Sequence, residues 1–182
     1  MSSQTPDESS VSTENKRRAI VSSEHLAVNE AWQLSEMEYG LIMAQNGLLR
    51  WVTRAMAAAG YPDLSAQETL VLHNVNHRGR EKRLTDIAFM LNFEDNHIVN
   101  YALKKLIKAG LVSSQKRGKE MFYSTTEMGI KACEDYREVR EKCLVDAALT
   151  SDGFIAEMGR TAKVLRNLSG LYDQASRAAT SL

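Results

Sequence analysis

Three short segments between residues 85 and 110 constrain this chain more than any other feature. Thr85 is expected to cap a short apolar helix over residues 86–91, and residues 92–95 form a tight turn. Asp95 is expected to cap a longer helix that runs to Ala109 and ends at Gly110. Two helices joined by so short a turn are typical of a helix-turn-helix, whose second helix can present polar side chains to a nucleic-acid groove.

The helix expected over residues 95–109 has one apolar and one polar face. The apolar stripe predicted for the core is Val99, Leu103, Leu106 and Ile107, with Ile98 and Ala102 beside it. The outward positions share one face at helical spacing: Asn96, His97, Asn100, Tyr101, Lys104, Lys105 and Lys108. We predict contacts with base edges from the first four of these, and phosphate contacts from the three lysines.

A basic hairpin follows this helix. Short strands are predicted over residues 111–115 and 121–125, and residues 116–120 form the turn between them. The turn supplies three further candidate phosphate contacts, Lys116, Arg117 and Lys119. Arg78 and Arg80, in the polar connection over residues 78–83, complete the predicted set of phosphate contacts.

The charge of the chain looks unfavourable for nucleic-acid binding until it is resolved by position. The 182 residues contain 23 basic and 23 acidic side chains, so the formal net charge is zero. Residues 78–120 contain ten basic and five acidic side chains, a net charge of +5, and the rest of the chain carries −5. The basic centre coincides with the helix and the hairpin, which favours DNA as the partner over a merely solvated charged face.

These segments resemble the MarR family of winged-helix transcription regulators. Leu84 to Asn92 is similar to the family's first helix-turn-helix segment, and Val99 to Val112 to its recognition helix and Gly-Leu-Val exit. Thr126-Glu127-Met128-Gly129 is similar to its motif after the wing, and the resemblance covers residues 35–175. It implies a mainly α winged helix-turn-helix with a small β-hairpin wing and long N- and C-terminal dimerisation helices.

Two departures from the family pattern affect the expected contacts. The wing has Lys116-Arg117-Gly118-Lys119-Glu120 in place of the family's Asp-x-Arg pair, so the residue that enters the minor groove is open. The recognition helix is preceded by Glu94 and Asp95, whose carboxylates favour a helix start but repel phosphate. Base contacts are therefore expected to begin at Asn96.

The chain is expected to have four parts. Residues 1–24 are predicted to be a disordered tail, in which Lys16-Arg17-Arg18 is a solvated basic run or, alternatively, an arm that contacts phosphates. Residues 25–60 form the N-terminal dimerisation region, residues 61–126 the DNA-binding lobe, and residues 127–182 the C-terminal dimerisation helices.

Capping signals predict where the helices of these parts begin. Capping boxes are predicted at Ser35 with Glu38 and at Ser65 with Glu68, and the first helix should end at Gly60. Thr126 is expected to cap a helix over residues 127–149, and Ser151 or Asp152 to cap the last helix. The resemblance implies a homodimer with the first and last helices at its interface, and the wide apolar faces of these helices agree with it; packing of the two helices within one chain is the alternative.

Other chemistry has weaker support. No nucleophile–base, phosphate-loop or metal motif is complete, so the chain is predicted not to be an enzyme and to need no cofactor. His73 and His77, with His97 as a third ligand, form at most part of a metal site, and side-chain packing is the simpler interpretation. Cys133 and Cys143 are too far apart to bridge within one helix, and burial of both is favoured over redox sensing. Trp51 and Met56 either line a ligand pocket or belong to the core.

The sequence therefore predicts a homodimeric transcription regulator that binds double-stranded DNA at a pseudo-palindromic operator, with a small-molecule effector as a further candidate partner. A winged-helix module for protein–protein contact, without specific DNA binding, is the alternative. No run of 18 apolar residues and no signal peptide are seen, so no membrane contact is expected and the expected location is cytoplasmic.

Overall fold

The computed structural model describes residues 22, 24–26, 32–149 and 153–182, and the chain divides into two units that meet between Gly47 and Leu48. The expected tail over residues 1–24, with its basic run at residues 16–18, lies outside the described residues except for Ser22 and Glu24. The predicted caps Ser151 and Asp152 also lie outside them. No described helix is long and apolar enough to cross a membrane.

The first unit contains a short 3-10 helix, η1 (Glu24–Leu26), and the first part of α1 (Trp32–Ala58). Because α1 begins at Trp32, Ser35 lies inside the helix and the capping box predicted there is wrong. Ser35 is buried instead, and its hydroxyl donates to Ser22 Oγ at 2.9 Å. A hydroxyl within the first turn has no helix boundary to cap, so a cap motif alone does not locate a helix start.

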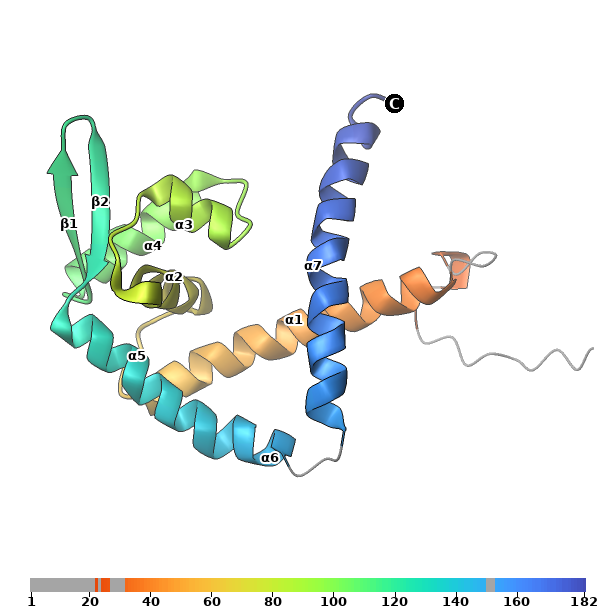
Figure 1. Ribbon diagram of the computed structural model, residues 1–182, viewed down its shortest axis with the longest axis horizontal. Coiled ribbons are helices and arrows are strands. Elements are labelled where there is room, and N and C mark those ends of the chain that lie inside the picture. The colour runs from red at the N-terminus through yellow and green to blue at the C-terminus, as the bar shows by residue number, and fades with distance from the viewer. Residues whose placement is uncertain (1–21, 23, 27–31, 150–152) are drawn as a thin grey trace, which may run out of the picture. The chain divides into compact units, whose positions relative to one another are not determined.

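The second unit contains the end of α1 and all later elements (Figure 1). In chain order these are α2 (Ala66–Asn76), η3 (His77–Gly79), α3 (Leu84–Met90), α4 (Asn96–Lys108), β1 (Val112–Arg117), β2 (Glu120–Thr125), α5 (Glu127–Arg140), the π-helical η4 (Glu141–Val145), α6 (Asp146–Leu149) and α7 (Phe154–Ala179). The chain is thus mainly helical with one antiparallel hairpin, as predicted.

Side-chain caps mark the start of α2, α4 and α5. Ser65 Oγ accepts the Glu68 N–H and Glu68 accepts the Ser65 N–H, which confirms the capping box of α2. Asp95 and Thr126 cap α4 and α5 as predicted. The cap predicted for α3 is wrong: α3 begins one residue earlier than Thr85, and the Arg83 N–H donates to Asp86.

The core lies where α2, α3, α4 and the hairpin pack together. Val99, Leu103 and Leu106 of α4 are buried in it, as predicted. Ile98 and Ile107 are not: their exposed fractions are 40% and 37%. Both isoleucines follow or precede a buried position directly, and one helix step of about 100° turns such a neighbour toward the rim of the apolar face.

The hairpin is longer and its turn tighter than predicted. Val112 pairs with Thr125 and Arg117 with Glu120, so Gly118 and Lys119 alone connect the strands. Gly118 has a φ of +61°, which suits a residue without a Cβ. Lys82 forms one isolated antiparallel bridge to Tyr123, which joins the connection before α3 to the two-stranded sheet. Figure 1 shows the hairpin beside α3 and α4.

A close approach fixes the junction between the hairpin and α5. A Cβ on Gly129 would lie 2.0 Å from the carbonyl oxygen of Leu111, so only glycine fits in the first turn of α5. Thr126 reinforces the junction, since its hydroxyl donates to the Gly110 carbonyl at 2.7 Å. The Thr-x-x-Gly motif therefore has a packing reason: it lets α5 start directly against the end of α4.

The C-terminal helices bury less than the rest of the unit. The helix predicted over residues 127–149 is present, with a π-helical turn over Glu141–Val145. No residue of α7 is buried, although it carries exposed Phe154, Ile155 and Met158. These apolar side chains are left without an apolar environment in a single chain.

Candidate nucleic-acid interface

One face of α4 presents the side chains predicted to contact bases. Asn96, His97 and Tyr101 are exposed, and Asn100 is half-buried among them. Asp95 is turned to the backbone, because its carboxylate accepts the His97 N–H at 2.8 Å. The amide and imidazole groups of the first turn are thus available for donor and acceptor contacts outside the protein.

The three lysines of α4 are not equivalent. Lys104 and Lys108 have no carboxylate partner among the described residues, whereas Lys105 Nζ lies 2.8 Å from Glu68 Oε1. Lys105 also lies over the ring of Tyr101, 5.4 Å from its centroid. Lys105 therefore ties α4 to the capping box of α2, and it is less free than its neighbours to neutralise a phosphate.

Glu68 is the acidic partner in this contact between α2 and α4. Its side chain is buried, and burial alone would raise its pKa, but the Lys105 ammonium and the Ser65 N–H outweigh burial and lower it. The same pair raises the pKa of Lys105. One carboxylate thus caps α2 with one oxygen and holds α4 with the other.

The basic side chains of the hairpin, like those of α4, include some with a carboxylate partner and some without. Lys116 and Lys119, at and beside the tip, have no carboxylate partner in the described part of the chain. Arg117 has three partners: its guanidinium lies 2.7 Å from Glu81, donates to Gln115 Oε1 at 2.6 Å, and lies over Phe122 with 5.2 Å to the ring centroid. A second pair joins Arg83 to Glu120 at 3.0 Å. These contacts stiffen the hairpin.

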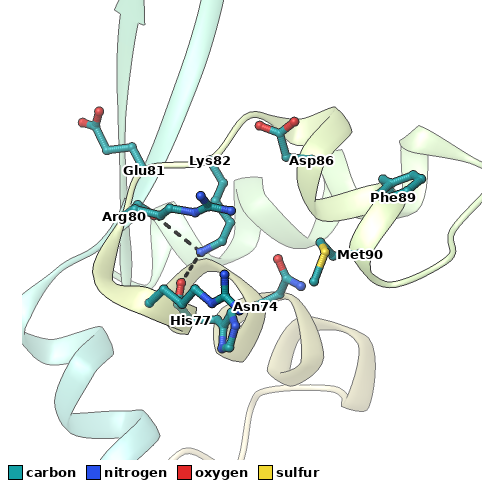
Figure 2. A pocket seen from close by; sticks show the side chains of 9 residues that line it. Asn74, His77, Arg80, Glu81, Lys82, Asp86, Phe89 and Met90 are labelled. Carbon is teal, nitrogen blue, oxygen red and sulfur yellow. Dashed lines mark hydrogen bonds between the residues drawn. The ribbon is translucent and has the colours of Figure 1, made fainter. Parts of the chain in front are cut away.

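Arg78 and Arg80 lie away from the hairpin tip. The Lys82–Tyr123 bridge is antiparallel, so the residues before Lys82 lie toward the base of the hairpin, where Thr125 donates to Asn76. Both arginines line a cavity with His77 and Met90, shown in Figure 2. This placement separates both arginines from the candidate phosphate contacts at the hairpin tip.

Sequence reasoning missed Lys82, which it counted only as one more basic residue. Lys82 is 5% exposed, and its ammonium donates to the carbonyls of Val75, His77 and Arg80 at 2.9, 2.6 and 3.4 Å. Burial, followed by repulsion from the two neighbouring arginines, lowers its pKa. A cation at the C-terminal carbonyls of α2 is a favourable end for that helix. Three consecutive charged residues, Glu81, Lys82 and Arg83, show no apolar alternation, so the sequence offered no signal for the burial of Lys82.

The remaining candidates separate into core and surface. His73 stacks edge-on against Tyr136 with 4.6 Å between centroids, and burial lowers its pKa. In the described residues, no three metal-ligating side chains come together.

The ligand-pocket and redox candidates separate into core and surface. Met56 belongs to the core. Cys133 is buried, as favoured, but Cys143 is exposed, so the expectation that both are buried is wrong: the π-helical turn places Cys143 beyond the packed part of α5.

The comparisons with known proteins agree with this geometry. The family described as "Winged helix DNA-binding domain" matches residues 64–129, the segment that holds α2, α3, α4 and the hairpin. No curated protein matches the chain. Residues 64–129 are therefore similar to a winged helix DNA-binding domain.

Solved structures place the chain more narrowly. It is similar to NMB1585, a MarR family regulator from Neisseria meningitidis, with 18% identity, a TM-score of 0.59, and coverage of 82% of this chain and 97% of that one. NadR in complex with 4-hydroxyphenylacetate is 22% identical, with a TM-score of 0.56 over 73% of this chain and 92% of that one. The oxidised form of MarR from E. coli is 14% identical, with a TM-score of 0.59 over 70% and 92%. The fold is that of the MarR family regulators, which confirms the predicted fold class and the resemblance.

Proposed function

We propose that this chain is a MarR-type transcription regulator, without catalytic activity, that binds double-stranded DNA in the cytoplasm. The observation that carries the proposal is the polar and basic face of α4 inside a winged helix DNA-binding domain. Fold and domain match support a transcription regulator over a module for protein contact alone. In that alternative the unpaired lysines on α4 and the hairpin tip would serve solubility alone, whereas DNA binding gives both groups one partner.

The structure sharpens which residues are proposed to contact DNA. Base contacts are proposed from Asn96, His97, Asn100 and Tyr101, because they lie together on the open face of α4. Phosphate contacts are proposed chiefly from the unpaired lysines, which are Lys104, Lys108, Lys116 and Lys119. Lys105 and Arg117, held by Glu68 and Glu81, are proposed to act mainly by positioning α4 and the hairpin.

A homodimer is proposed as the binding species. The exposed apolar side chains of α7 support it, and so do those of α1, Ile42, Met43 and Leu48 among them. We retain the division into residues 25–60, 61–126 and 127–182, with dimerisation assigned to the first and last parts. A symmetric dimer would place two α4 helices on half-sites about one turn of DNA apart, which predicts a pseudo-palindromic operator.

A small-molecule effector is proposed as well. NadR was solved with 4-hydroxyphenylacetate. That precedent from a protein of the same fold supports an effector for this chain, and the experiment on DNA below can be repeated with and without candidate compounds.

DNA binding is tested by fluorescence anisotropy on duplexes selected by the protein from a random pool, over a range of salt concentrations. Lys104→Ala should weaken binding to every sequence and reduce the slope of log affinity against log salt by about 1, since it removes one phosphate contact. Asn100→Ala should instead relax discrimination at one base pair, by about 1–3 kcal/mol. The matched control Lys105→Ala should change the salt slope less than Lys104→Ala, because its charge is already paired. Absence of DNA affinity at low salt would overturn the proposal.

A further inference from the structure

A cavity of about 600 Å³ opens between the end of α2, the loop that follows it and α3. Its volume lies within the range of pockets that bind small molecules. Figure 2 shows its wall: His77, Arg80 and Lys82 come from the end of α2 and the loop, and Asp86, Phe89 and Met90 from α3. It lies within the lobe and toward the base of the hairpin, away from the tip.

The lining carries a net positive charge, since three cations face two carboxylates, and of the two only Asp86 also attracts Arg80, without a direct ion pair. Arg78, Arg80 and Lys82 all face the cavity, and none of the three has a carboxylate partner among the described residues. The two acids of the lining are already engaged: Glu81 with Arg117 at 2.7 Å and Asp86 with Arg83 at 3.0 Å. Repulsion from the two arginines contributes, after burial, to the lowered pKa of Lys82. An anion in this cavity would relieve that repulsion.

The donors that remain free are those of the arginines. The Lys82 ammonium already donates hydrogen bonds to the carbonyls of Val75, His77 and Arg80. Arg80 and Arg78, by contrast, have no side-chain hydrogen bond within the described residues. A guanidinium offers two parallel N–H groups that match a carboxylate, so the available donors favour a carboxylate over a neutral group.

The opposite wall is apolar and unusually open. Phe89 is 84% exposed and Met90 59%, although both belong to the helix that buries Ile87 and Ala88. An aromatic ring and a thioether at the edge of a cationic cavity provide a surface for a flat apolar group. One wall of the cavity is therefore cationic, and the opposite wall is apolar.

We propose that this cavity binds a small organic anion, with its carboxylate held by Arg78 and Arg80 and its apolar ring packed on Phe89 and Met90. The site is new relative to the DNA interface, and it reassigns two arginines that the sequence had offered to phosphates. It stands on the lining of the cavity, so it does not depend on whether α4 binds DNA.

The site is tested on the full chain by isothermal titration with 2-naphthoate, its neutral analogue 2-naphthamide, and acetate. We expect 2-naphthoate to bind at least roughly tenfold more tightly than either, since one analogue lacks the charge and the other the ring. The variant Arg78→Gln/Arg80→Gln should lose roughly tenfold or more of the 2-naphthoate affinity, and Phe89→Ala should lose a smaller part. The matched control Arg166→Gln, on α7 and outside the cavity, should bind as the unaltered chain does.

Equal affinity for 2-naphthoate and 2-naphthamide, no binding of either, or unchanged affinity in the double arginine variant would each overturn the site. Because Phe89 is exposed, Phe89→Ala should fold normally and gives an independent test if the arginine variant does not fold. DNA binding is measured in a separate titration without 2-naphthoate. Loss of DNA affinity with normal 2-naphthoate binding would therefore contradict the proposed function alone, and the reverse result the cavity alone.

Discussion

Apolar side chains are buried in one region of the molecule and exposed in another: the first is residues 64–136, which hold most of the lobe and the packed part of α5, and the second is the helix α7. The lobe buries Leu72, Leu103 and Leu106 completely or nearly so, among elements of its own chain. In α7, 26 residues long, nothing is buried, and Ile155 and Met158 are about half exposed. The hydrophobic effect acts equally on both, so the first region buries its apolar side chains within one chain, whereas the exposed face of α7 is the surface that the proposed dimer would cover.

The largest expected effect tests whether the lobe is self-sufficient. Leu106→Ala removes a fully buried side chain and should lower the free energy of unfolding by roughly 2–5 kcal/mol. Met158→Ala on α7 is the matched truncation, and its smaller loss should depend on protein concentration, because it would act through the dimer. Denaturant titrations at two protein concentrations measure both. If Met158→Ala lowered the free energy of unfolding as much as Leu106→Ala does, and equally at both protein concentrations, the contrast between the two regions would be contradicted.

The next effect tests the proposed partner of α7 directly. Ile155→Glu/Met158→Glu places two charges on the apolar face and should cost the dimer roughly 3 kcal/mol or more, enough to leave monomers at micromolar concentration. Sedimentation equilibrium measures the dissociation constant. Lys163→Glu, an exposed position of the same helix, is the control and should leave association nearly unchanged. An unaltered dimer in the double variant would assign the interface elsewhere.

A smaller effect within the lobe tests the tie between α2 and α4. Glu68→Gln removes the charge that holds Lys105 and should cost about 1 kcal/mol of unfolding free energy at neutral pH. The pKa of Glu68 is lower in the folded chain than its ordinary value of 4.5. Its contribution is therefore complete above that value and disappears as the pH falls through the lowered folded pKa.

The difference in stability between the unaltered chain and Glu68→Gln should accordingly shrink in acid. Urea titrations from neutral pH to below the ordinary pKa follow it, with the exposed Glu94→Gln as control. A difference that stays constant with pH would show that the carboxylate acts by shape and not by charge.

The smallest effect compares a cysteine of the packed region with one that lies between this region and α7. Burial, and then the charge of Glu134, raises the pKa of the Cys133 thiol to about 11, whereas Cys143 beyond the packed part of α5 is exposed. A disulfide reagent at mildly alkaline pH should modify Cys143 rapidly and Cys133 only slowly. Cys143→Ser should abolish the rapid phase, and a rapid phase that persists would mean that the lobe opens near Cys133.

Much of the lobe was predictable because its signals are local. Ser65, Asp95 and Thr126 cap helices whose first turns follow at once, and the buried residues of α4 recur at helical spacing. The same type of signal failed at Ser35, where the helix extends three residues further toward the N-terminus. It failed again at Thr85, since Asp86 accepts the Arg83 N–H and starts α3 earlier. At the candidate site, the sequence located the face of α4 but could not rank its lysines.

Local patterns in the sequence determined the order of helices, the hairpin and the outward face of α4, because capping and periodicity act over a few residues. The tertiary structure decided which charges are free. Lys105 meets Glu68, Arg117 meets Glu81, and Lys82 meets the end of α2. The two ion pairs join residues more than thirty positions apart in the chain, and only the packed fold brings such groups within the few ångströms over which charges pair strongly.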